Sequence, residues 1–109
     1  MSLRVPFDYG IIEIITEVIG KPQSPETERT LENVKAAASK LKSIQPTLVV
    51  TIKELDITSK EVTTKYGVLT PPALATNGVI KIVGRVPDEE EVIESLKEAA
   101  STVGIDYRA

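Results

Sequence analysis

The chain has 109 residues, of which 41% are hydrophobic and 27% charged, and it carries a net charge of −3 with neither cysteine nor histidine. The missing side chains exclude a disulfide framework, thiolate catalysis, cysteine-based zinc or iron–sulfur sites and a serine–histidine triad, while a domain of this length can bury a core without disulfides. The acidic balance, the lack of an apolar run of about 20 residues and the lack of a signal-peptide pattern predict a cytoplasmic protein with no nucleic-acid or membrane partner.

The first part of the chain predicts a strand, a loop and a helix. Residues 9–15 read Tyr-Gly-Ile-Ile-Glu-Ile-Ile, which is apolar on both parities and typical of a strand that is covered on both faces. We expect residues 16–23 to form a loop, which ends in the turn-forming sequence Gly-Lys-Pro-Gln. A helix is predicted from Pro25 until Pro46 limits it, because the residue before a proline avoids helical backbone angles. Its apolar residues recur at helical spacing and are Leu31, Val34, Ala38 and Leu41.

The middle of the chain predicts a second strand and a short helix. Residues 47–55 are rich in β-branched and apolar side chains, which favour strands. Thr58 with Glu61 three residues later matches a capping box at the start of a helix that ends near Tyr66. Gly67 follows, at the place where helices commonly end on a residue with a positive φ angle.

The last part of the chain predicts a hairpin and a third helix. Two short apolar runs, residues 72–76 and 79–83, flank an Asn-Gly dipeptide. A type I′ turn favours this dipeptide because both of its central residues need positive φ angles. Asp88 and Glu91 form a second capping box. The predicted apolar face of this helix consists of Val92, Ile93, Leu96, Ala99 and Ala100.

The resulting order of elements is β-α-β-α-β-β-α, in a single domain over residues 1–109 with a flexible extension over residues 1–8. A strand–helix–strand crossover joins two parallel strands, and the hairpin adds two strands antiparallel to each other. Helices must cover both faces of such a sheet. We therefore expect an α/β fold with a four-stranded mixed sheet flanked by three helices.

Two groups of motifs occur at a characteristic spacing. Ser24-Pro25-Glu26-Thr27 opens the first helix and is soon followed by Asn33-Val34. Tyr66-Gly67-Val68 precedes Pro71-Pro72-Ala73-Leu74, and Gly84-Arg85-Val86-Pro87 follows the hairpin. This pattern resembles the small redox-active disulfide proteins, which are glutaredoxin-like members of the thioredoxin fold. Their first helix opens Cys-Pro-x-Cys, and their later motifs are Tyr-Gly-Val, Thr-Pro-Ala-Leu and Gly-Arg-Val-Pro. The resemblance covers roughly residues 24–100.

The resemblance implies a thioredoxin-like fold with the strand order 2-1-3-4 and a cis bond before Pro72, within the loop Thr70-Pro71-Pro72. It places Ser24-Pro25-Glu26-Thr27 at the position of the redox motif, so both cysteines are replaced. The loop over residues 16–23 is longer than in the family. In this fold the residue before the cis-proline offers its N–H and C=O to an extended partner peptide. Pro71 has no N–H, so half of that pairing is lost.

The hydroxyls of Ser24 and Thr27 have two interpretations. Hydroxyl groups at the N-terminus of a helix can help to bind an anion. Ser24 followed by Pro25 is also a common N-cap pair, and nearby Glu26 and Glu28 already place negative charge at this helix end. We therefore favour a capping role for Ser24.

Several other residues have ordinary structural interpretations. Arg85 is expected to form a solvated ion pair with Asp88 or Glu89 rather than to bind a ligand carboxylate. The acidic run over residues 88–91 suits the first turn of a helix, and we expect no metal there. Tyr66 is expected to bury its ring and to keep its hydroxyl in water. Pro71-Pro72 is either a recognition element or only a rigid turn.

Three functions remain open. The first is a redox-inactive binding or scaffolding module that acts through the cis-proline face on an unidentified protein or peptide, with no catalytic residue and no cofactor. The second is a divergent enzyme of the thiol-disulfide oxidoreductase family that relies on a cofactor or a partner thiol, although no phosphate-binding or metal motif supports it. The third is an oligomerisation domain, such as a homodimer formed through the third helix or the hairpin edge. We favour the first, because a fold can persist without its chemistry.

Overall fold

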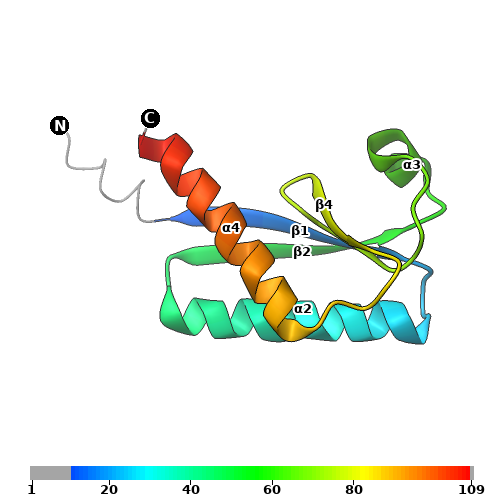
Figure 1. Cartoon of the computed structure of the whole chain (residues 1–109), viewed down its shortest axis with the longest axis horizontal. Helices are drawn as coiled ribbons and strands as arrows, with labels where there is room; N and C mark the ends of the chain where they lie inside the picture. Colours follow the sequence, from blue (N-terminus) through cyan, green and yellow to red (C-terminus); the bar gives the residue numbers. More distant parts are fainter. Residues whose placement is uncertain (1–10, 109) are drawn as a thin grey trace.

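A four-stranded mixed sheet with the strand order β2-β1-β3-β4 organises the chain (Figure 1). The computed structural model describes residues 11–108, so the predicted extension over residues 1–8 lies outside the described residues. Along the chain the elements are β1 (Ile12–Gly20), α2 (Pro25–Ile44), β2 (Leu48–Asp56), α3 (Lys60–Tyr66), β3 (Ala73–Thr76), β4 (Val79–Val83) and α4 (Glu89–Arg108). The predicted fold class and strand order are confirmed. No helix within residues 11–108 is long and apolar enough to cross a membrane.

The middle strand, β1, extends further than predicted and ends at Gly20 rather than Ile15. It pairs in parallel with β2 along its whole length and antiparallel with β3 along its second half. The predicted loop over residues 16–23 is therefore wrong, since only residues 21–24 separate β1 from α2. The pattern was misleading because Glu17 places a charge in the strand, and charged side chains are rarely buried unless they are paired.

The two faces of the sheet are covered unequally. The helices α2 and α4 pack on one face, over a core formed by Ile14, Val18, Val34, Ala37, Leu41, Leu48, Leu74, Val92, Leu96 and Ala99. The short helix α3 packs on the other face, over a cluster formed by Ile19, Val62, Ala73 and Ala75. Ile15 and Val49 remain 44% and 40% exposed. The prediction that residues 9–15 form a strand covered on both faces is therefore wrong for residues 11–15, and residues 9 and 10 lie outside the described residues. The part of β1 that is buried on both faces is residues 16–20.

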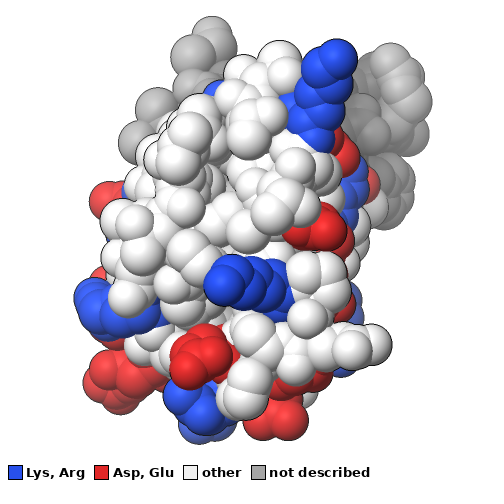
Figure 2. All heavy atoms as spheres, turned by 90° about the vertical axis from the view of Figure 1, so that its right-hand side faces the viewer, with Lys and Arg blue, Asp and Glu red and all other residues white. Residues whose placement is uncertain are grey.

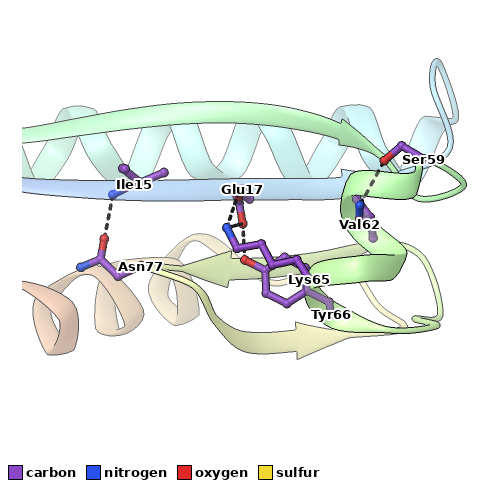
Figure 3. Close-up of polar contacts among 7 residues, drawn as sticks. All are labelled: Ile15, Glu17, Ser59, Val62, Lys65, Tyr66 and Asn77. Atoms are coloured by element: carbon purple, nitrogen blue, oxygen red, sulfur yellow. Dashed lines mark hydrogen bonds and ion pairs between the residues drawn. The ribbon is translucent and has the colours of Figure 1, made fainter.

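Local hydrogen bonds set the ends of α3. The Ser59 side chain begins this helix by accepting a hydrogen bond from the Val62 N–H at 3.3 Å (Figure 3). The predicted cap at Thr58 is therefore wrong, because Thr58 instead donates its N–H and its hydroxyl to the carboxylate of Asp56. Gly67 ends the helix with a φ of 81°, as predicted.

The hairpin and the start of α4 form as predicted. Asn77 and Gly78 have φ angles of 50° and 82°, and the Asn77 Oδ1 atom accepts a hydrogen bond from the Ile15 N–H at 2.9 Å (Figure 3). The Asp88 side chain accepts from the Glu91 N–H at 2.8 Å, and the Glu91 carboxylate accepts from the Asp88 N–H at 3.0 Å. This reciprocal pair is the predicted capping box.

A buried carboxylate joins α3 to the sheet. Glu17 in β1 is 2% exposed, and its side chain points toward α3 (Figure 3). Lys65 Nζ lies 3.1 Å from Glu17 Oε2, and the Tyr66 hydroxyl donates to Glu17 Oε1. The predicted solvated hydroxyl of Tyr66 is therefore wrong, because the buried carboxylate requires donors. Burial and the hydrogen bond to Glu17 raise the pKa of Tyr66, and the hydrogen bond to Glu17 raises the pKa of Lys65.

Removing the Tyr66 hydroxyl should destabilise the fold. In Tyr66→Phe, the buried carboxylate of Glu17 keeps only Lys65 as a donor, and the loss of a donor to a buried charged group costs about 1–3 kcal/mol. Urea unfolding should show a loss of this size. Lys65→Gln is the matched control and should cost less, because the Lys65 side chain is 46% exposed and its charge is partly solvated.

The pH dependence of stability checks the same contact. The pKa of Tyr66 is raised above its ordinary value of 10.0 in the folded state, so the protonated phenol stabilises the fold below about pH 10. This contribution is lost as the pH rises through the folded-state pKa. The free energy of unfolding should fall more steeply above about pH 10 for the unaltered chain than for Tyr66→Phe. Parallel pH profiles would contradict this account of the contact.

Candidate functional site

The two hydroxyls at the start of α2 are bonded to each other. Ser24 is the N-cap: its Oγ accepts from the Thr27 N–H at 3.1 Å, and its hydroxyl donates to Thr27 Oγ1 at 2.7 Å. Pro25 follows in the first turn, together with the acidic side chains of Glu26 and Glu28. The capping role of Ser24 is therefore confirmed. The Thr27 N–H, one of the groups that would bind an anion at this helix end, is already used by Ser24.

Gly20 makes room for this pair at the end of β1. The side chain of Thr27 is buried. A Cβ atom added to Gly20 would lie 2.2 Å from Thr27 Oγ1 and 3.2 Å from Thr27 Cβ. Gly20, the last residue of the strand, therefore lies so close to the helix that any side chain at this position would overlap Thr27. In the sequence, Gly20 is only the first residue of the predicted turn Gly-Lys-Pro-Gln, and no local signal reveals its contact with Thr27.

The cis-proline loop lies beside the start of α2. The peptide bond between Pro71 and Pro72 is cis, as the resemblance implies. The N–H of Gly84 lies 3.0 Å from the Thr70 carbonyl oxygen and 2.9 Å from the Pro72 carbonyl oxygen. Among residues 11–108, no backbone N–H donates to the carbonyl of Pro71, which stands between these two. The loop thus offers one hydrogen-bond acceptor whose partner is not within this part of the chain.

A groove of about 320 Å³ brings these segments together. It is lined by Lys21, Ser24, Glu26, Pro71, Pro72, Gly84, Arg85 and Val86. Four of the predicted site residues, Ser24, Glu26, Pro71 and Pro72, therefore meet in one place. The remaining three, Pro25, Thr27 and Thr70, are not part of the lining. Lys21 was not predicted, because a lysine in a loop carries no specific signal.

Charge is unevenly distributed over the surface at this end of the molecule. Figure 2 views the molecule from the side on which α3 lies, and most of the charged side chains in this view lie in its lower half. Three of the residues that line the groove, Lys21, Glu26 and Arg85, are charged. In the loop that leads to Pro71, Val68 is 95% exposed.

Arg85 is engaged within the chain. Its guanidinium donates two hydrogen bonds to the carboxylate of Glu91, at 2.8 and 2.5 Å. The predicted pairing with Asp88 or Glu89 is therefore wrong, because the capping box turns Glu91 back toward Arg85, and Glu89 instead pairs with Lys40. Arg85 and the Asp88 N–H lower the pKa of Glu91 to about 2, while Glu91 raises the pKa of Arg85. The pair orients Arg85 at the edge of the groove.

One further contact fixes the frame of the site. Asn33 Nδ2 in α2 donates to the Pro87 carbonyl at 2.8 Å. This hydrogen bond ties α2 to the turn that carries Arg85 and that leads into α4. Asn33 was noted only as part of a motif, and its partner lies far away in sequence. Within residues 11–108 no group of three or more His, Cys, Asp or Glu side chains is placed to hold a metal ion.

Adding a side chain at Gly20 should disrupt the hydroxyl pair. In Gly20→Ala, the new methyl group would overlap Thr27 Oγ1, so either β1 or the first turn of α2 must move. Such overpacking typically costs about 1–3 kcal/mol. Thermal unfolding should show the loss, and the effect should be partly relieved in Gly20→Ala with Thr27→Ala, which removes the clashing oxygen. Fully additive losses in this double-mutant cycle would show that the two residues are not coupled.

Comparisons with known proteins agree on one family. Residues 15–97 match the family model described as a thioredoxin domain. The solution structure of the oxidised thioredoxin from Plasmodium falciparum superposes with a TM-score of 0.55 at 13% identity, over 92% of this chain and 93% of that one. The X-ray structure of Fasciola hepatica thioredoxin gives a TM-score of 0.55 at 16% identity, over 89% and 90%.

A comparison with curated proteins gives no match. At their levels of identity the two solved structures establish the fold alone, whereas the family model spans most of the chain. The sheet order, the helix that begins at Ser24 and the cis bond before Pro72 agree with that assignment. The chain therefore belongs to the thioredoxin domain family, and it is a member without cysteine.

Proposed function

We propose that the protein is a redox-inactive binding module that holds an extended segment of a partner protein against its cis-proline face. The observation that carries this proposal is the composition of the groove. Two hydroxyls bonded to each other stand where the family has its redox motif, beside a Pro71 carbonyl with no donor among residues 11–108. These features support a site that holds an extended peptide and has no reactive thiol.

The chemistry of the hydroxyl pair supports redox inactivity. Thiol–disulfide exchange begins with the attack of a thiolate on a disulfide sulfur. The chain has no cysteine, and the Ser24 hydroxyl instead caps a helix end and donates to the hydroxyl of Thr27. These hydroxyl groups do not form stable anions near neutral pH, and an alkoxide–sulfur bond is no substitute for a disulfide. The protein therefore keeps the fold and lacks the exchange reaction.

The exposed groups around the groove support binding to an extended chain. A peptide laid along the loop can donate one N–H to the Pro71 carbonyl, as in the addition of a strand to a sheet edge. Pro71 returns no hydrogen bond, because it has no N–H. The half-buried Val86 lines the groove and can add an apolar contact. Binding through one backbone hydrogen bond and apolar contacts suits a modest, reversible affinity.

Restoring two cysteines should restore a disulfide. In the double variant Ser24→Cys and Thr27→Cys, the sulfur atoms would replace oxygens that already touch at 2.7 Å. A disulfide should form on mild oxidation, and the thiol at position 24 should titrate below about 8.5 because the helix N–H groups favour the thiolate. Thiol labelling and a pH titration measure both effects.

The unaltered chain is the control for this variant. In an insulin-reduction assay with dithiothreitol it should match the protein-free blank, since it has no thiol. The double variant should give weak activity, because Pro71 still withholds one backbone donor from the substrate. Acceleration by the unaltered chain would refute the redox-inactive role. Two free thiols with ordinary pKa values in the variant would refute the assignment of the site.

Giving the loop an N–H should strengthen peptide binding. The probe is a set of linear peptides selected from a phage-displayed random library against the full chain. In Pro71→Thr the new N–H can pair with a peptide carbonyl, and one such hydrogen bond should tighten binding about two- to tenfold. Isothermal calorimetry measures the change. Pro46→Thr makes the same substitution at an exposed proline far from the groove and should leave affinity unchanged.

The location of binding decides the outcome. The selected peptides should shift the backbone NMR signals of Ser24, Gly84 and Arg85 in the unaltered chain. If the peptides instead perturb residues outside the groove, or if Pro71→Thr and Pro46→Thr behave alike, then the cis-proline face is not the binding surface.

A further inference from the structure

The edge strand β2 has free backbone groups on its outer side. β2 pairs only with β1 among the described residues, and the bond from the Ile12 N–H to the Thr47 carbonyl at 3.1 Å fixes its orientation. In a parallel pair, alternate residues of a strand direct their N–H and C=O toward the neighbour. The backbone groups of Val50, Ile52 and Glu54 therefore point outward.

The two ends of this edge are closed and the stretch between them is open. The Leu48 N–H donates to the Gln45 carbonyl at 3.0 Å, and the Leu48 carbonyl accepts from Lys42 Nζ at 3.1 Å. Both groups face outward, as their position in the alternation requires. The edge is closed again at its far end, where the outward carbonyl of Asp56 accepts from the Ser59 N–H at 2.9 Å. Between Leu48 and Asp56, no hydrogen bond to the outer side of β2 forms within residues 11–108. An open, regular edge of this kind readily accepts a further strand.

The opposite edge of the sheet is much less suitable. β4 has five residues, and its pairing with β3 is interrupted by a bulge next to Leu74 and Ala75. Short strands and bulges are common ways in which proteins prevent edge-to-edge pairing. β2 has nine residues, and its register with β1 continues without interruption from Leu48 to Asp56. Edge pairing is therefore expected at β2.

The charges of β2 indicate what the added strand is. The first five residues, 48–52, read Leu-Val-Val-Thr-Ile, and the charged side chains lie at the other end, at Lys53, Glu54 and Asp56. A second copy aligned in parallel would place like charges side by side. An antiparallel second copy places the charged end of each strand beside the apolar end of the other. The antiparallel direction thus keeps the like charges of the two copies apart, which favours it over parallel pairing.

We propose that two copies of this chain pair antiparallel along β2, around a two-fold axis at Thr51. In this register Val50 lies opposite Ile52 of the second copy, and both residues offer outward N–H and C=O groups. On the exposed face, Thr51 meets Thr51 of the second copy, and Val49 meets its Lys53. A cross-strand Thr–Thr pair is favourable, and the aliphatic stem of Lys53 can lie over Val49. A two-fold axis at Ile52 would instead place Val49 opposite Leu55 of the second copy, so charge variants at Val49 distinguish the two registers.

The proposed dimer does not depend on the proposed binding function. None of the residues that line the cis-proline groove belongs to β2. Each copy would therefore keep its own groove, and the assembly would present two of them. Failure of peptide binding would leave the dimer intact, and a monomeric chain would leave peptide binding intact.

Charge variants at Val49 test the register as well as the dimer. Val49 is 40% exposed on the face that α3 leaves open, so the variants should fold. In Val49→Glu, the new carboxylate would lie opposite Lys53 of the second copy, and the two-fold axis makes this pair occur twice in the dimer. The dimer should therefore bind about two- to thirtyfold more tightly, whereas Val49→Lys should weaken dimerisation by a similar factor. Thr51→Lys places like charges together on the axis and should yield a monomer. Analytical ultracentrifugation of the full chain measures all three.

Matched changes on the other edge serve as the control. Val79→Glu and Val79→Lys alter an exposed valine of β4 and should leave the dimer unchanged. Circular dichroism confirms that each variant is folded. A full chain that stays monomeric at high concentration would overturn the proposal. This holds even if a variant without residues 1–10 forms a dimer. Equal effects of Glu and Lys at Val49 would also overturn it.

Discussion

A carboxylate in the middle of β1 constrains the surrounding structure. Glu17 is almost fully buried in a strand with neighbours on both sides, and a buried charge is tolerated only when donors reach it. Lys65 and Tyr66 supply those donors from the last turn of α3. The helix is only seven residues long, so this contact and its small apolar cluster hold it in place. Because α3 leads directly into the cis-proline loop, the position of that loop depends on the same contact.

The site shows how a redox fold can remain ordered without thiols. Ser24 and Thr27, at the positions where the resemblance places the redox cysteines, form a hydrogen-bonded pair in which Ser24 also caps α2. Gly20 allows the close approach of β1, and Asn33 ties the helix to the turn before α4. The packing around this hydroxyl pair is thus ordered without a covalent link.

Local signals in the sequence predicted most of the fold. The Ser24-Pro25 start of α2, the Asn-Gly turn at residues 77–78 and the Asp88–Glu91 capping box each depend on residues within one turn of each other, and each formed as predicted. The errors concern partners distant in sequence. The predicted strand ended too early, and the Tyr66 hydroxyl that hydrogen-bonds the buried Glu17 lies in another element.

The same limit applies to the candidate site. Ser24, Pro71 and Pro72 were predicted because a motif at known spacing marks them, and the structure brings them into one groove. Gly20 was missed because its importance lies in the space it leaves for Thr27. The partner of Arg85 was mistaken because the capping box decides where Glu91 points. Thr58 and Ser59 are adjacent, and both side chains can cap a helix. The residue at which α3 begins therefore depends on the tertiary structure, which makes Ser59 the N-cap.

The proline at position 71 also constrains the composition of a bound segment. With no N–H at Pro71, the backbone link proposed at this residue is the one that the partner donates to the Pro71 carbonyl. A partner residue that is itself a proline, or that is N-methylated, has nothing to donate at that point. The loop would therefore reject imino acids at one position of the segment it holds, although it makes no contact with the side chain there. Selectivity of this kind arises from the backbone alone.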